Sequence, residues 1–197
     1  MQLEKTEGIV LKSVVYQEDA RILSLFTKDL GMISLMVKVV SPRSLQKMAA
    51  ASPFCQAEFV YLKGQSEMLH YRDSTLLEEH LFLRNSLSSL QTAGSLAVAL
   101  LKSQMPGKSA PALYHLFNAY LKQIPAFTHP PVLISSFYLK VLSHEGVLHL
   151  QDLTATFQEQ ELLKEILLIR SFEKLKSITF RAALAEKIAL YFQATLF

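Results

Sequence analysis

Three cations lie in a part of the chain that contains no carboxylate. Lys38, Arg43 and Lys47 follow an alternating apolar segment, and no aspartate or glutamate occurs between Asp29 and Glu58. Lysine and arginine side chains on an acid-free loop can neutralise the phosphates of a polyanion without breaking any bond. Ordinary solvated charge produces the same pattern, so both interpretations stay open. The stretch is the first candidate for a nucleic-acid contact.

Residues suited to catalysis lack suitable partners in the sequence. Cys55, the single cysteine, follows Phe54 in an apolar segment with no histidine nearby, which favours a buried, inert thiol. His144 and His149 flank Gly146, but no third strong ligand has a metal-site spacing. The chain also lacks the glycine patterns of nucleotide-binding loops. We expect no enzyme, no metal, no cofactor and no small-molecule substrate.

Composition limits the class of protein. The 197 residues are 50% hydrophobic, which is enough for a real core, and 20 basic residues against 17 acidic ones give a net charge of +3. A nucleic-acid partner would therefore require the positive charge to be concentrated in one place. A single cysteine, the lack of a signal peptide and the lack of a long apolar run favour a cytoplasmic protein and no membrane partner.

The periodicity of apolar residues divides the chain in two. Residues 7–74 alternate with period two and give five short strands, with a hairpin at 27–31 where Gly31 would adopt a positive φ. Five strands suit a small antiparallel barrel of the oligonucleotide-binding (OB) type, although the strand count also fits an SH3-like barrel. The fold class expected is α+β. A five-stranded OB-type β-barrel over residues 1–76 would bind nucleic acid, and an all-α helical domain over 77–197 would follow it.

The second half has helical spacing. Apolar residues recur every three or four positions over 83–101, and Pro111 begins a second helix. Thr128 is the expected cap of a third helix, which Gly146 ends. A last helix is expected to open at Thr179.

Other side chains of the predicted barrel could extend the cationic loop. Lys12 and Lys63 lie on other strands and could join the loop in one electropositive face. Tyr61 and Tyr71 are candidate rings for base stacking, although aromatic residues at strand spacing lie in the core more often.

A resemblance to a known family rests on the N-terminal segment "EGIVLKSVVYQEDARILSLFTKDLGMISLMVKVVSPRS". The segment resembles the start of the bacterial recombination mediators of the RecO family. The shared features are the Glu-Gly-Ile-Val-Leu strand at 7–11, the acidic turn at 18–19, Arg-Ile-Leu at 21–23, Thr-x-x-x-Gly at 27–31 and the basic loop with proline at 38–44. Pro53-Phe54 matches the opening of the fourth strand. The match is specific over residues 7–63 and weaker in the helices.

Two departures from the family pattern matter. Many members carry a four-cysteine zinc module, whereas residues 150–160 of this chain pass straight into helix, so zinc is not carried over. The basic loop is also thinner, because "KVVSPRS" stands where the family usually has consecutive arginines.

The resemblance implies a non-enzymatic mediator of DNA repair and homologous recombination. Such proteins bind single- and double-stranded DNA, anneal complementary strands, partner RecR and the single-stranded-DNA-binding protein, and help load recombinase on gaps. In this chain Lys38, Arg43 and Lys47 would contact phosphates, with Lys12 and Lys63 in support. Arg21 matches the family's Arg-Ile-Leu position and would either bind DNA or pair with the acidic turn. The alternative is a protein-interaction adaptor whose barrel binds DNA weakly or not at all.

Overall fold

The computed structural model describes residues 2–16, 18, 20–38, 49–64, 68–153, 156–178 and 181–196. The chain forms two compact units. Residues 1–82 and 104–118 belong to the first unit, and residues 83–103 and 119–197 belong to the second. Each unit has its own core, and each is described separately below.

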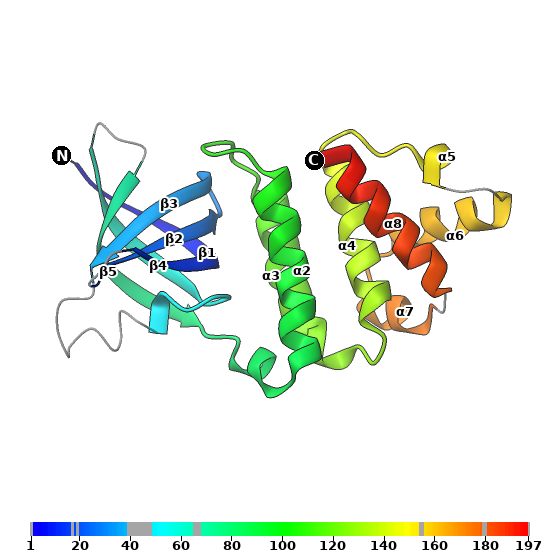
Figure 1. Ribbon diagram of the computed structural model, residues 1–197, viewed down its shortest axis with the longest axis horizontal. Coiled ribbons are helices and arrows are strands. Elements are labelled where there is room, and N and C mark those ends of the chain that lie inside the picture. Colours follow the sequence, from blue (N-terminus) through cyan, green and yellow to red (C-terminus); the bar gives the residue numbers. More distant parts are fainter. Residues whose placement is uncertain are drawn as a thin grey trace. The chain divides into compact units, whose positions relative to one another are not determined.

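Five strands form the first unit. They are β1 (Gln2–Tyr16), β2 (Ala20–Thr27), β3 (Gly31–Lys38), β4 (Gln56–Lys63) and β5 (Met68–Glu78) (Figure 1). They close into a barrel in the order β1-β2-β3-β5-β4, in which only the β3–β5 pair is parallel. This strand order, closed through the parallel β3–β5 pair, is the OB-type arrangement, so the expected α+β fold with an N-terminal OB-type barrel is confirmed.

Alternate residues of each strand fill the barrel. The interior contains fully buried side chains such as Leu23, Leu35 and Phe59. One irregularity changes the alternation, because the β1–β2 register shifts between Val10 and Lys12. The shift makes Leu11 an extra residue, a β-bulge, so that Val10 faces the core while Lys12 faces outward.

The hairpin between β2 and β3 is held by its first residue. Thr27 Oγ1 accepts the amide of Leu30 at 3.1 Å and donates to the carbonyl oxygen of Gly31 at 2.7 Å. Gly31 has a φ of 67°, as the sequence predicted, because a residue without a Cβ closes this turn without strain.

A second segment of the chain, residues 104–118, completes the barrel unit. Pro106 bridges to the start of β3, and the Gly107 amide donates to the Met32 carbonyl at 3.2 Å. The helix α3 (Pro111–Gln123) follows, and its Tyr114 ring packs 6.1 Å from the ring of Phe26, measured between centroids. This segment therefore covers one part of the barrel's outer surface.

Helices form the second unit. They are α2 (Leu87–Ser103), the end of α3, η3 (Ile124–Ala126), α4 (Pro130–His144), α5 (Leu150–Leu153), α6 (Phe157–Leu168), α7 (Phe172–Ser177) and α8 (Ala182–Leu196), while η2 (Leu81–Asn85) lies at the boundary. Tyr120 and Ser136 share a buried hydrogen bond of 2.8 Å between their hydroxyl groups. Lys140 of α4 donates to the carbonyl oxygens of Leu167 and Ile169 at the end of α6.

The ends of the third predicted helix differ in one detail. The expected cap at Thr128 is wrong, because the N-cap residue of α4 is His129, and no side-chain hydrogen bond caps this end. Pro130 and Pro131 occupy the first turn, where missing amide donors cost nothing, so no cap is needed there. Gly146, with a φ of 74°, follows the helix as predicted. Thr179, the expected start of the last helix, lies outside the described residues.

None of the helices in the part of the chain that the structure describes combines the length and the apolar character needed to cross a bilayer.

Candidate nucleic-acid interface

Strand register places three rows of side chains on the outside of the barrel. Leu23, Leu35 and Leu69 pair across β2, β3 and β5 and face the core, so their neighbours along each strand face outward. We call the middle row the apolar belt; it consists of Leu3, Leu62, His70, Met36, Ile22 and Val14. The Lys12 row consists of Lys12, Ser24, Ser34 and Met68, and the Lys38 row consists of Lys38, Ala20 and Tyr16.

The outward surface is only partly covered by the barrel unit's own chain. Phe26 and Met32 also point outward, but Tyr114 and Pro106 lie against them and leave both almost wholly buried. The three rows are more open. Lys12 and Lys38 are exposed, Val14 is 44% exposed, and Ile22 and Met36 are half-buried.

Two of the predicted cations share this surface. Lys12 and Lys38 lie in rows four residues apart along the strands, which is about 13 Å, on either side of the apolar belt. None of the side chains that make up the three rows is acidic. Among the described carboxylates, Glu7 is nearest in sequence to Lys12 and Asp29 is nearest to Lys38, while Glu18 lies in the turn between β1 and β2. The arrangement gives a positive surface with an apolar centre.

Two other predicted cations have a different place. Lys63 is exposed, but its register with Gln2 puts it on the core-facing side at the barrel's end, where its ammonium lies 3.6 Å from Glu4. Arg21 pairs with the buried Val37, so it also lies on the core-facing side, and its Nη1 donates to Ser13 Oγ at 3.3 Å. The structure therefore does not bring Lys63 and Arg21 to the surface that Lys12 and Lys38 share.

The remaining two predicted cations, Arg43 and Lys47, lie outside the described residues. Their predicted role as phosphate contacts stays a prediction.

The two candidate stacking rings belong to the barrel interior. Tyr61 is buried, and its hydroxyl donates to Glu4 at 3.1 Å. Burial and this carboxylate together raise the pKa of Tyr61 to about 12. Tyr71 packs against the same core and shares a 2.8 Å hydrogen bond with Ser74, and burial raises its pKa. Neither ring faces the three rows.

The sequence reasoning missed Tyr16, Met36 and His70. Tyr16 is 45% exposed at the end of the Lys38 row, and His70 lies beside Met36 in the apolar belt. Simple alternation could have found Met36 and Lys38 together on β3, since both are even-numbered residues of one strand. The link to β5 required the parallel register, which no sequence motif signals.

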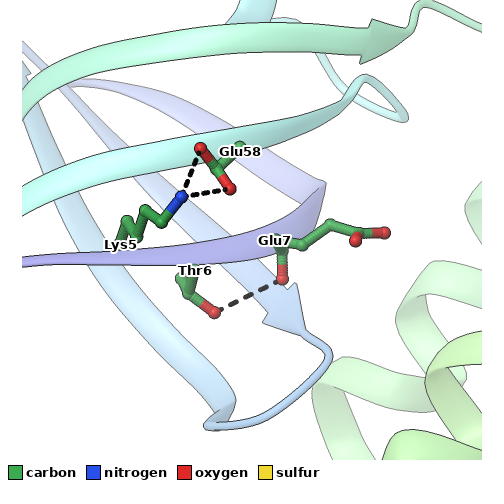
Figure 2. A network of polar contacts seen from close by, with 4 residues as sticks. All are labelled: Lys5, Thr6, Glu7 and Glu58. Atoms are coloured by element: carbon green, nitrogen blue, oxygen red, sulfur yellow. Dashed lines mark hydrogen bonds and ion pairs between the residues drawn. The ribbon is translucent and has the colours of Figure 1, made fainter.

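One further cation of the barrel, Lys5, is neutralised by a neighbour. Figure 2 shows Lys5 of β1 next to Glu58 of β4, with the ammonium 3.2 Å and 3.1 Å from the two carboxylate oxygens. Lys5 therefore provides a natural comparison for Lys12, which lies on the same strand. Within the described part of the chain, neither Lys12 nor Lys38 forms an ion pair.

The residues weighed for catalysis occupy ordinary positions. Cys55 is buried as predicted, and its sulfur lies 3.8 Å from the carbonyl oxygen of Glu79. His144 lies 3.1 Å from the carboxylate of its neighbour Glu145. Among the described residues, no three histidine, cysteine or acidic side chains gather in a group that could hold a metal ion.

The topology and the outer surface define an OB-type barrel protein with an additional helical unit. Residues 1–80 match the family model described as "Recombination protein O N terminal". The chain belongs to the RecO family.

Several proteins similar to the chain are named DNA repair protein RecO. It is 30% identical over 166 residues to DNA repair protein RecO of Thermoanaerobacter sp. (strain X514), which covers 83% of this chain and 66% of the relative. It is 30% identical over 143 residues to DNA repair protein RecO of Chlamydia muridarum, and this match covers 73% of the chain and 61% of the relative. A third relative, DNA repair protein RecO of Chlamydia pneumoniae, is 22% identical over 218 residues, and this match covers 95% of the chain and 86% of the relative. The chain thus spans slightly less than two thirds of the first two relatives.

Proposed function

We propose that this protein is a non-enzymatic mediator of DNA repair and recombination that binds DNA on the outer surface of its barrel. The observation that carries the proposal is the placement of Lys12 and Lys38 on one acid-free surface. OB-type barrels commonly bind oligonucleotides on the face of strands 2 and 3, and this is the face that the three rows occupy. Family membership supports the same role.

Strand annealing would use the same positive surface. Annealing two strands needs their charge to be screened while bases meet, and cations do this without any catalytic group. We therefore propose that the protein anneals complementary strands, partners RecR and the single-stranded-DNA-binding protein, and helps load recombinase on gaps. A cytoplasmic, nucleoid-associated location belongs to this proposal. Strand annealing with and without a coat of single-stranded-DNA-binding protein measures the activity directly.

The DNA-binding surface is tested with the double variant Lys12→Gln/Lys38→Gln. Affinity for a labelled single-stranded oligonucleotide is measured by fluorescence anisotropy over a range of salt concentrations. Each phosphate contact on a single strand contributes about −0.7 to the slope of log affinity against log salt. Loss of two contacts should therefore make the slope shallower by about 1.4.

Lys5→Gln is the matched control, because Lys5 is an exposed cation of the same strand that Glu58 already neutralises. Its slope should equal that of the unchanged protein. Arg43→Gln/Lys47→Gln tests the predicted loop contacts in the same way. A slope that Lys12→Gln/Lys38→Gln leaves unchanged would remove the outer surface as the DNA site.

One observation favours the adaptor alternative. Lys63 is engaged by Glu4, and Arg21 bonds Ser13 on the core-facing side, so the described part of the chain presents fewer free cations than the sequence suggested. If the unchanged protein shows no salt-dependent affinity for DNA, the adaptor hypothesis replaces the mediator hypothesis.

A further inference from the structure

Lys140 of α4 is a half-buried amine that is bonded to uncharged acceptors. Its Nζ donates to the carbonyl oxygens of Leu167 at 2.6 Å and Ile169 at 3.0 Å, at the end of α6. One turn earlier on α4, Ser136 Oγ donates to the carbonyl oxygen of Ile166 at 3.5 Å. Two side chains of α4 therefore satisfy carbonyl groups that the end of a helix leaves without an intrahelical partner.

Several other lysines have acidic partners. Those whose ammonium group forms an ion pair with a glutamate are Lys5, Lys63, Lys164 and Lys176. A neighbouring carboxylate favours the charged form of an amine, which has no lone pair to offer an electrophile. The charge that acts on Lys140 is instead that of Arg170, and burial together with this guanidinium lowers the pKa of the amine. A larger fraction of Lys140 is therefore neutral at a given pH than of an ordinary lysine.

The two carbonyl groups also suit the neutral amine. An ammonium group has three N–H groups, whereas a neutral amine has two N–H groups and one lone pair. Lys140 donates to two carbonyl oxygens, so it can release its third proton without giving up either of these hydrogen bonds. The lone pair then lies on the side of the nitrogen away from both carbonyl groups. Desolvation and a cationic neighbour are general means by which a protein turns a lysine into a nucleophile.

Arg170 indicates which electrophile suits the site. Its side chain is exposed, and it lies close enough to act on the charge of Lys140. A guanidinium group binds phosphate oxygens with two parallel hydrogen bonds. An acyl phosphate carries such a phosphate directly on the activated carbonyl carbon. Arg170 can therefore hold the anionic leaving group while the amine of Lys140 meets the acyl carbon.

We propose that Lys140 is a modification site at which the amine takes the acyl group of a small acyl phosphate, such as acetyl phosphate. The Nζ lone pair attacks the acyl carbon, a C–N bond forms, and the C–O bond to the phosphate breaks. The phosphate leaves with that electron pair and takes up the proton that the nitrogen loses, so hydrogen phosphate is the second product. The inference concerns the helical unit and does not depend on DNA binding by the barrel.

Acylation releases the end of α6 from α4. The amide nitrogen that results has one N–H group and no charge, so it can donate to at most one of the two carbonyl oxygens. Leu167 and Ile169 lie directly before Ser171, the N-cap residue of α7. The modification therefore loosens the junction between α6 and α7.

Competitive acetylation compares every lysine within one protein. The whole folded chain is treated with limiting acetyl phosphate near neutral pH, and mass spectrometry of its peptides gives the rate at each site. Lys140 should react at least about threefold faster than Lys187, an exposed lysine of α8. In urea this advantage should disappear, because the unfolded chain no longer holds the carbonyl groups and Arg170 beside the amine.

Arg170→Gln tests whether the neighbouring guanidinium activates the site. It should slow acetylation of Lys140 toward the rate of Lys187, and circular dichroism shows that the variant is folded. Arg181→Gln is the matched control, because it removes another exposed arginine of the same unit, and it should leave the rate unchanged. Acetylation of Lys140 no faster than that of Lys187 in the folded protein would overturn the proposal. So would a rate that Arg170→Gln leaves unchanged.

Hydrogen exchange measures the effect on the helices. Lys140→Gln has no charge, as the acylated side chain has none, and it should increase amide exchange over residues 167–177. Lys140→Arg cannot be acylated in this way but keeps the charge and several donors, so it should increase exchange less. Equal exchange in the two variants would show that the charged contact does not hold the α6–α7 junction, and it would overturn the proposed release.

Discussion

Gly31 shows how one residue joins two segments that are distant in sequence. It ends the β2–β3 hairpin with a φ of 67°, and a Cβ at this position would lie 2.0 Å from the carbonyl oxygen of Lys108. Two features therefore require that residue 31 has no Cβ: the positive φ of the turn and the close approach of residues 104–108 to the barrel.

Substitution of Gly31 by alanine should be strongly destabilising. Because the atom in the way is backbone, the segment must shift, and we expect Gly31→Ala to lower the free energy of unfolding by about 3 kcal/mol or more. Gly107→Ala is the control, since Gly107 has a similar φ of 73° but nothing within 4 Å of its added Cβ. It should cost about 1 kcal/mol. Urea denaturation measures both, and equal losses would contradict a steric role for Lys108.

At the scale of elements, β1 decides which side chains form the candidate surface. If Leu11 were paired regularly, without a bulge, strict alternation from the core residue Val10 would turn Lys12 inward. A one-residue bulge reverses this and places Lys12 in line with Ser24 and Ser34. The proposed nucleic-acid surface thus depends on a local irregularity of the strand.

Such irregularities limit what the sequence can predict. The alternating runs over 7–74 and the helical spacing after 83 were sufficient for the fold class, because they report burial along one element at a time. The sharing of a face by Lys12 and Lys38, and the separate place of Lys63, depend on register between strands. Register is set by bulges and by long-range pairing such as β3 with β5, which leave no local pattern.

A partly buried polar network attaches α3 to the barrel within the first unit. Glu7 Oε1 accepts hydrogen bonds from Gln56 Nε2 at 2.7 Å and from the Tyr114 hydroxyl at 3.0 Å, while Asn118 Nδ2 donates to Gln56 Oε1 at 3.1 Å. Burial and the Glu7 carboxylate raise the pKa of Tyr114. The helix is therefore held by specific donors and acceptors as well as by the contact with Phe26.

This network predicts energetic coupling between Glu7 and Tyr114. In a double-mutant cycle with Glu7→Ala and Tyr114→Phe, the coupling in unfolding free energy should be about 1–2 kcal/mol, because the hydrogen bond is partly buried and has a charged acceptor. Tyr120→Phe serves as the control, since its hydroxyl bonds Ser136 instead. It should show coupling near zero with Glu7→Ala. Equal coupling of both tyrosines would contradict a direct contribution of the hydrogen bond.

At the scale of the whole molecule, buried phenols link stability to pH in both units. Burial is the main cause that raises the pKa of five tyrosines, which are Tyr61, Tyr71, Tyr114, Tyr120 and Tyr138. For Tyr61 in the barrel unit and Tyr120 in the helical unit the raised pKa is about 12, against 10.0 for an ordinary phenol. The folded protein therefore retains these protons at pH values where the unfolded chain has released them.

The sign of the effect follows from proton binding. Because the folded pKa lies above the unfolded one, the stabilisation is fully present below pH 10 and is lost as the pH rises from 10 to about 12. Each such tyrosine should contribute a slope of about −1.4 kcal/mol per pH unit within that window. Urea denaturation of the unchanged protein between pH 7 and 11 should show a flat region followed by a steep fall. Tyr120→Phe removes one titrating phenol, so its fall should be shallower by about one such slope, whatever its stability at neutral pH. A fall equally steep in Tyr120→Phe would mean that other groups carry the alkaline sensitivity of the helical unit.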